Sequence, residues 1–221
     1  MKIVAVVGLI GSGKDTIADY LVNFHNFRRE SFASSLKDAV SHIFGWDRTL
    51  LEGRTQSARD WREQTDKWWA ERLGMPNLTP RWVLQYWGTE VGRKAFHTDI
   101  WIASVENKLR HYNDDIVISD CRFPNEIASI KNAGGIVIRV KRGPDPEWYN
   151  DAAITNTGDR NSVEWGNAAN RFLSQNIHAS ESAWAGSKFD YVVENDSTID
   201  NLYKKIEDIL KNPALNPPAS T

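Results

Sequence analysis

Residue types that bind phosphate gather near the N-terminus, in the run Gly8-Leu9-Ile10-Gly11-Ser12-Gly13-Lys14-Asp15-Thr16. The three glycines let backbone N–H groups curl around an anion, and the N-terminus of a following helix adds its partial positive charge. Lys14 then reaches the outer phosphates of a nucleotide. The run follows the apolar segment Ile3 to Val7 and opens a helical pattern, so we predict a nucleotide-binding phosphate loop rather than a chance match.

Asp15 departs from the general form of this loop, which has Ser or Thr directly after the lysine. Thr16 follows one position later. The metal shell is therefore expected to be unusual, with Asp15 or Thr16 as the magnesium ligand supplied by the loop.

A second group follows the apolar run that ends at Ser119. Phosphoryl transfer needs cations and a metal more than a base, because the protein mainly positions two anionic substrates and neutralises their charge. Asp120 can hold magnesium directly or through water. Arg122 lies on the same side, and its guanidinium fork could bridge donor and acceptor phosphates. A strand-end ion pair between Asp120 and Arg122 remains an alternative before substrate arrives.

Further arginines surround a later polar segment that we interpret as a flap. An arginine delivered by a closing flap would stabilise the transferred phosphoryl group and exclude water. Arg142 is the first candidate, because it lies at the base of the flap. Arg139 is expected to point inward as a structural residue, and Arg160 and Arg171 are either flap cations or solvated side chains.

A helical pattern around residues 81 to 93 carries a row of hydrogen-bond donors. Spacing of four puts Arg81, Gln85 and Thr89 on one face, and Arg93 continues it. The opposite positions supply the packing side: Trp82, Val83, Tyr86 and Trp87. The row suits a phosphate and a base edge, although a solvated polar face is the plain alternative. Lys37, in an earlier helical pattern, is a further cation that could equally be solvated.

Five segments with buried-strand character alternate with helical patterns, which predicts an α/β fold with a five-stranded parallel sheet flanked by helices. These segments are Ile3 to Val7, Arg28 to Phe32, Ile116 to Ser119, Ile136 to Val140 and Tyr191 to Val193. Apolar side chains at helical spacing predict amphipathic helices between these strands. Their apolar faces are formed by Ile17, Tyr20, Leu21 and Phe24; by Leu36, Val40, Ile43 and Phe44, behind a Ser34 or Ser35 cap; and by the apolar residues of Ile199 to Leu210.

Two long stretches interrupt this alternation, and a parallel sheet needs neither. We therefore expect a phosphate-loop core over residues 1–44, 114–141 and 188–211, a helical acceptor-binding insertion over 45–113 and a lid over 142–187. Residues 212–221 are expected to form a loose tail. The lid segment is polar with weak periodicity, which suits a mobile flap better than a packed unit.

Composition narrows the functional classes. The chain has 221 residues, a net charge of −2 and scattered Lys and Arg, which gives no support for nucleic-acid binding. A single cysteine excludes an internal disulfide framework, and the five histidines show no metal-ligand spacing. Nothing is long and apolar enough to span a membrane, so a cytoplasmic protein with small-molecule partners is expected. Ten tryptophans favour packing roles, with Trp101 as the exception.

The ordered motifs resemble the deoxynucleoside monophosphate kinases of tailed bacteriophages, within the P-loop nucleoside monophosphate kinase group. The motifs are Gly-Ser-Gly-Lys-Asp-Thr at 11–16, Phe32-Ala33 with Lys37, Leu84-Gln85 with Gly88-Thr89-Glu90, Asp99-x-Trp101, Asp120-x-Arg122 with Asn125-Glu126, His178-x-Ser180-Glu181 and Asn195-Asp196. Lys14-Asp15-Thr16 is itself similar to the family form. The resemblance implies an adenylate-kinase-like fold with a core, an acceptor-binding insertion and a lid.

The same resemblance implies residue roles. Lys14, Arg122 and a lid arginine would stabilise transfer, Asp120 with Asp15 or Thr16 would hold magnesium, and Asn195 would lie near the adenine of ATP. The candidate acceptor-binding residues are Arg81, Gln85, Arg93 and Trp101, joined by Lys37 and Glu126.

The resulting hypothesis is an ATP-dependent kinase, with Mg²⁺, that converts a deoxynucleoside 5'-monophosphate to the diphosphate, in a host cell's cytoplasm if the chain is viral. Another small-molecule P-loop kinase, such as one acting on dephospho-coenzyme A, is the runner-up. A nucleotide-dependent switch or motor is disfavoured, because Cys121 stands after Asp120 where a catalytic Glu would be needed. The accepted base and any homodimer are left open by the sequence.

Overall fold

A five-stranded β-sheet is the central element of the protein, whose computed structural model describes residues 1–212. Its strands are β1 (Ile3–Val7), β2 (Arg28–Glu30), β3 (Ile116–Ile118), β4 (Ile136–Lys141) and β5 (Tyr191–Glu194). They pair in parallel in the order β2-β3-β1-β4-β5. The predicted α/β fold with a five-stranded parallel sheet is confirmed. All five residues of β1 are buried, as expected for a central strand covered on both faces.

The chain divides into two compact units. The first comprises Met1–Ser31 and the chain from Tyr112 onward, and the second is Phe32–His111. The first unit therefore holds the sheet and the segment predicted as a lid. Apart from Asn212, the predicted tail lies outside the described residues.

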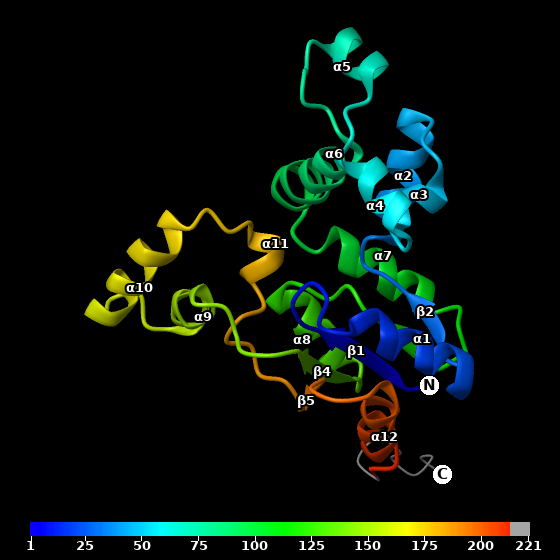
Figure 1. Ribbon diagram of the computed structural model, residues 1–221, viewed down its shortest axis with the longest axis vertical. Helices are drawn as coiled ribbons and strands as arrows, with labels where there is room; N and C mark the ends of the chain where they lie inside the picture. Colours follow the sequence, from blue (N-terminus) through cyan, green and yellow to red (C-terminus); the bar gives the residue numbers. More distant parts are fainter. Residues whose placement is uncertain (213–221) are drawn as a thin grey trace. The chain divides into compact units, whose positions relative to one another are not determined.

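Helices of the first unit are α1 (Lys14–His25), α8 (Pro124–Asn132), α9 (Trp148–Thr157), α10 (Val163–Ser174), α11 (Ala179–Ser182) and α12 (Ile199–Leu210) (Figure 1). Val4 and Val6 of β1 share one apolar cluster with α1 and α12. Side chains alternate along a strand, so Ile3 points to the other face, where α8 contacts β1 and β4. The core is thus formed on both sides of the sheet.

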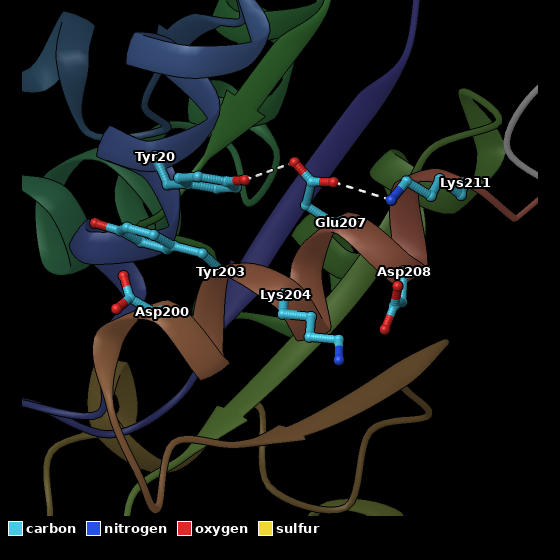
Figure 2. A pocket seen from close by; sticks show the side chains of 7 residues that line it. All are labelled: Tyr20, Asp200, Tyr203, Lys204, Glu207, Asp208 and Lys211. Atoms are coloured by element: carbon cyan, nitrogen blue, oxygen red, sulfur yellow. Dashed lines mark hydrogen bonds and ion pairs between the residues drawn. The ribbon is translucent and has the colours of Figure 1, made fainter.

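The pairing of α1 with α12 includes a stack of Tyr20 on Tyr203, with ring centroids 4.0 Å apart. The Tyr20 hydroxyl donates to Glu207 Oε1 at 2.8 Å, and burial together with this carboxylate raises the pKa of Tyr20 to about 12. Phe24, predicted on the buried face, is 70% exposed in the last turn of α1. A surface cavity of about 290 Å³ lies over these helices and includes no residue of the glycine loop (Figure 2).

The lid segment is more regular than its sequence suggests. Helices α9 and α10 pack against each other (Figure 1), with Ala152 and Ala168 fully buried. Arg171 donates to both oxygens of Asp151 across this contact. The expectation of an unpacked segment is wrong, because buried alanines contribute little to a hydrophobic pattern.

The second unit is helical, with α2 (Ser34–Phe44), α3 (Arg48–Glu52), α4 (Gln56–Glu63), α5 (Lys67–Leu73), α6 (Pro80–Tyr86), the π-helix η1 (Trp87–Phe96) and α7 (Ile100–Leu109). Its core contains Leu36, Val40 and Trp46, with most of the other tryptophans of this unit packed around them. Trp68 is the exception at 63% exposed. The expected packing role of the tryptophans is otherwise confirmed.

Two local predictions for this unit are wrong. No side chain caps α2, since Ala33 is the N-cap and Ser34 is already helical. The π-helix η1 was not expected, and it alters the predicted donor row. Because a π-helix has a wider turn than an α-helix, four-residue spacing no longer keeps Thr89 and Arg93 in line with Arg81 and Gln85.

Candidate active site

The glycine loop joins β1 to α1, as the sequence predicts, and close neighbours fix its backbone. Gly13 is the N-cap of α1 with φ of 112°, in a region that disfavours side chains. A Cβ there would lie 2.6 Å from Asn195 Nδ2, and one at Gly8 would lie 2.4 Å from the carbonyl oxygen of Val140. The loop therefore lies tightly against the ends of β4 and β5, and only glycine fits at these two positions.

Lys14 folds back over this loop. Its Nζ donates to the carbonyl oxygens of Gly8 at 2.9 Å and Leu9 at 2.8 Å. Burial, reinforced by the positive charge of Arg122, lowers the pKa of Lys14 from its ordinary 10.5 to about 8. The ammonium is charged at neutral pH but costly to keep charged, so an incoming phosphate would relieve that cost.

Oxygen atoms cluster beside the loop at the carboxyl end of the sheet. Asp15 Oδ1 accepts from Ser119 Oγ at 3.1 Å and from Arg29 at 3.3 Å, and its side chain is 76% exposed. Asp120 Oδ2 accepts from Ser31 Oγ at 2.6 Å. Thr16 is half-buried in the first turn of α1. Carboxylate and hydroxyl oxygens are ligands that magnesium accepts, so the chemistry of this set fits the ion.

No group of three or more His, Cys, Asp or Glu side chains among residues 1–212 is arranged to hold a metal. A magnesium ion here would keep several water or phosphate ligands, which is its usual behaviour in nucleotide sites.

Arg122 lies close to the loop and is held at two points. Its backbone N–H donates to Glu126 Oε2 at 2.6 Å, and its guanidinium Nη1 donates to Glu181 Oε1 at 2.9 Å. Ser119, just before Arg122 in the chain, donates to Asp15 Oδ1 of the loop at 3.1 Å, and the positive charge of Arg122 contributes to the lowered pKa of Lys14. The structure thus brings the phosphate loop, Asp120 and Arg122 together, because β1 and β3 are neighbouring parallel strands.

Glu126 has a different position from the one expected of an acceptor-binding residue. It is only 2% exposed, and its Oε2 accepts from the backbone N–H groups of both Arg122 and Phe123. This carboxylate also complements the positive N-terminus of α8. Its contacts make it a support for the turn that carries Arg122.

Among the lid arginines, Arg142 and Arg139 both line a cavity beside the loop. The cavity has a volume of about 230 Å³ and is also lined by Gly11 and Ser12. Arg139 is buried as expected, pairs with Asp145 and lies over the ring of Tyr149. Arg160 is exposed. Arg171 pairs with Asp151 within the lid segment.

Asn195 contacts the loop itself. Its Nδ2 donates to the carbonyl oxygen of Ser12 at 2.8 Å, and its backbone N–H donates to Lys141 O at 2.6 Å. The side chain amide is therefore engaged in holding the loop, a contact that sequence alone did not suggest.

The remaining acceptor candidates all belong to the second unit. Lys37 pairs with Glu52 at 2.7 Å, and Arg81 pairs with Glu63 at 3.1 Å. Arg93 is buried and donates to the carbonyl oxygen of Thr98. The Trp101 indole donates to the carbonyl oxygen of Gly88 at 2.8 Å, and Gln85 is half-buried on α6. Lys37, Arg93 and Trp101 thus each contact other residues of their own unit.

Sequence reasoning overlooked several residues of this site. Ser31 and Ser119 could have been found, since each directly follows a strand segment at the end where ligands bind. Glu181 carried a weaker signal, because its motif lies 59 residues beyond Arg122 in a polar segment.

No family model matches the chain. Over 227 residues, covering 96% of the chain and 97% of the relative, it is 28% identical to a protein of Acanthamoeba polyphaga mimivirus described as "Putative deoxynucleotide monophosphate kinase". The chain resembles deoxynucleoside monophosphate kinases over nearly its whole length. It is also 28% identical to the deoxynucleoside-5'-monophosphate kinase of Escherichia phage T5, over 56% of the chain and 69% of that protein. The resemblance predicted from the motifs is confirmed.

A solved structure also aligns with most of the chain. Shikimate kinase from Aquifex aeolicus aligns over 96% of the chain and 98% of its own length, at 13% identity and a TM-score of 0.45. In the described part of the chain, residues 1–212, no helix combines the length and apolar character that crossing a bilayer requires.

Proposed function

We propose that this protein is an ATP-dependent kinase that transfers the terminal phosphoryl group of ATP to a deoxynucleoside 5'-monophosphate. One observation carries the proposal. Lys14 and Arg122 converge beside a glycine loop at the carboxyl ends of β1 and β3, in a chain similar along its length to a viral protein described as a deoxynucleotide monophosphate kinase. The viral origin of both relatives supports a place of action in the cytoplasm of an infected host cell.

Phosphoryl transfer between two anionic substrates requires positive charge that is held in a defined position. Two polyanions must approach end to end, and charge builds on the oxygens of the transferring group. Lys14 would leave the loop carbonyls to contact the outer phosphates of ATP, and Arg122 would bridge donor and acceptor through its planar fork. The acceptor phosphate is already ionised near neutral pH, so no general base is required.

Magnesium would be held by Asp120 and by Asp15 or Thr16. The ion would supply positive charge that neutralises part of the negative charge of the phosphates. Ser31 and Ser119 would orient the two carboxylates through the hydrogen bonds described above.

The donor nucleotide would occupy the glycine loop, with its phosphates on backbone N–H groups such as those of Gly11 and Gly13. Arg142, in the cavity beside Ser12, is the lid arginine best placed to contact it. We assign the lid role to residues 142–187 on this basis.

Acceptor binding is assigned to the helical insertion, residues 45–113, with Arg81 and Gln85 as the contacts for phosphate and base. Both lie on α6 and are accessible to solvent in part.

A coupled assay with an acceptor panel tests the proposal. ADP formation is measured with ATP, Mg²⁺ and each deoxynucleoside or ribonucleoside monophosphate in turn, alongside dephospho-coenzyme A. We expect ADP only when a deoxynucleotide is present, and loss of at least about a thousandfold in kcat for Lys14→Ala and Arg122→Ala with folding retained. Phosphate release without an acceptor, or stimulation by DNA, would favour a switch or motor instead.

A further inference from the structure

Glu181 is a carboxylate in a site that otherwise gathers positive charge. Its Oε1 accepts from Arg122 Nη1 at 2.9 Å, and its negative charge offsets a small part of the lowering that burial and Arg122 impose on the pKa of Lys14. The Glu181 side chain is 26% exposed and that of Arg122 is 41% exposed. The pair is therefore shielded in part, unlike an ion pair on an open surface.

The short helix α11 that carries Glu181 is anchored at both ends. At its start, His178 Nδ1 accepts from the backbone N–H of Ser180 at 3.2 Å. At its end, the Asn156 side chain donates to the carbonyl oxygens of Ser182 at 2.9 Å and Ala185 at 3.1 Å. Asn156 of the lid helix α9 thus holds the backbone that follows Glu181.

Arg122 is consequently held at two ends by two glutamates. Glu126 accepts a hydrogen bond from the Arg122 backbone N–H, and Glu181 of the lid segment accepts one from the Arg122 guanidinium. An arginine side chain loses much rotational freedom when it is ordered, and a partner that orders it beforehand removes that cost from the reaction step. One Nη1 contact leaves the rest of the planar fork, with its other N–H donors, for substrate phosphates.

We propose that Glu181 is a positioning residue, which orients the Arg122 guanidinium toward the transferring phosphoryl group and stays paired with it through the reaction. This inference rests on the proposed kinase function. It assigns to the lid segment a contribution that does not depend on any lid arginine.

Enzyme kinetics on four variants test it. Glu181→Ala should lower kcat about tenfold to a hundredfold, with the KM for ATP changed less than about threefold, because a misdirected guanidinium costs rate more than binding. Glu181→Gln should recover about half of the lost free energy, since its amide oxygen still accepts from Nη1 without the charge. In an Arg122→Ala background, Glu181→Ala should cost less than about twofold, because the pair is already broken. Glu164→Ala, an exposed carboxylate on α10, is the matched control and should retain activity.

Additive losses in the double variant would overturn the inference, and so would a faster reaction in Glu181→Ala, which would mean that the carboxylate competes with phosphate. A readout independent of turnover separates this failure from failure of the kinase proposal. In nitrogen-15 NMR, rotation about the Nε–Cζ bond of Arg122 should be slow in the unmodified protein and fast in Glu181→Ala, while Glu164→Ala leaves it slow. Equal rotation rates in the two proteins would reject the pairing even if the chain proves to be a kinase.

Discussion

Lys14 combines two properties at the residue scale: its ammonium lies over the glycine loop, and burial lowers its pKa to about 8. A lysine with an ordinary pKa would stay charged far above the physiological range. In the free enzyme, the Lys14 ammonium is therefore expected to lose its charge just above the physiological pH range.

The first prediction concerns the pH profile. Since kcat/KM reports the ionisation of the free enzyme, kcat/KM for ATP should fall about tenfold per pH unit above pH 8, while the substrate phosphates stay fully ionised. Lys14→Arg should be slower overall but should show no such decline, because a guanidinium stays protonated. A flat profile to pH 9.5 in the unmodified enzyme would contradict the assigned role of Lys14.

The second prediction concerns Asn195, whose amide holds the Ser12 carbonyl. Asn195→Ala should raise the KM for ATP about tenfold, because the loop loses one buried hydrogen bond. Asn195→Asp should raise it further, since a carboxylate would face the carbonyl oxygen and the phosphates. Asp196→Ala, whose side chain pairs with Lys205, is the neighbouring control and should leave the KM unchanged. Equal effects at both positions would refute the role.

At the scale of elements, a cluster of charges ties α2 to α3. Glu52 pairs with Lys37 at 2.7 Å and with Arg48. Burial opposes its ionisation, but the two cations outweigh burial and lower the pKa of Glu52 from 4.5 to about 2. Lys37, Arg48 and Glu52 thus form one charge network between α2 and α3.

The third prediction follows from this network. Because the folded-state pKa of Glu52 lies below its unfolded value, the stabilisation is complete above pH 4.5 and is lost as the pH falls toward 2. After allowance for solvent screening, it contributes about 1 to 2 kcal/mol. Glu52→Gln should lower the free energy of unfolding by that amount at pH 7 and by much less at pH 3. Chemical denaturation at both pH values measures this change in the free energy of unfolding. An equal loss at pH 7 and pH 3 would show that the ion pairs of Glu52 do not cause the stabilisation.

The elements also show where sequence reasoning succeeds. Strands β1, β3 and β4 were predicted to within one residue at each end, because continuous apolar runs mark buried parallel strands. The parallel order then places Asp120 and Arg122 beside the glycine loop without further information. The core of the site could be predicted for that reason.

Other features could not be predicted because they depend on packing between distant segments. The contact between α9 and α10 buries alanines, which carry a weak signal, and the π-helix η1 changes side-chain directions in a way that no spacing rule anticipates. The pairing of Glu181 with Arg122, and the direction of the Asn195 amide, are tertiary contacts between segments far apart in the chain.

At the scale of the whole molecule, the chain divides into two compact units. The first holds the glycine loop, Asp120, Arg122 and the lid segment, and the second holds Arg81 and Gln85. Under the proposed function, the first unit binds the donor nucleotide and the second binds the acceptor.

The fate of the terminal phosphate of ATP tests this account most directly. Purified protein is incubated with Mg²⁺ and ATP labelled in its γ-phosphorus, with and without a deoxynucleoside monophosphate, and the products are separated. We expect the label in the deoxynucleoside diphosphate, and none transferred by Lys14→Ala. Label found only in free phosphate, at the same rate with or without the acceptor, would contradict the central claim.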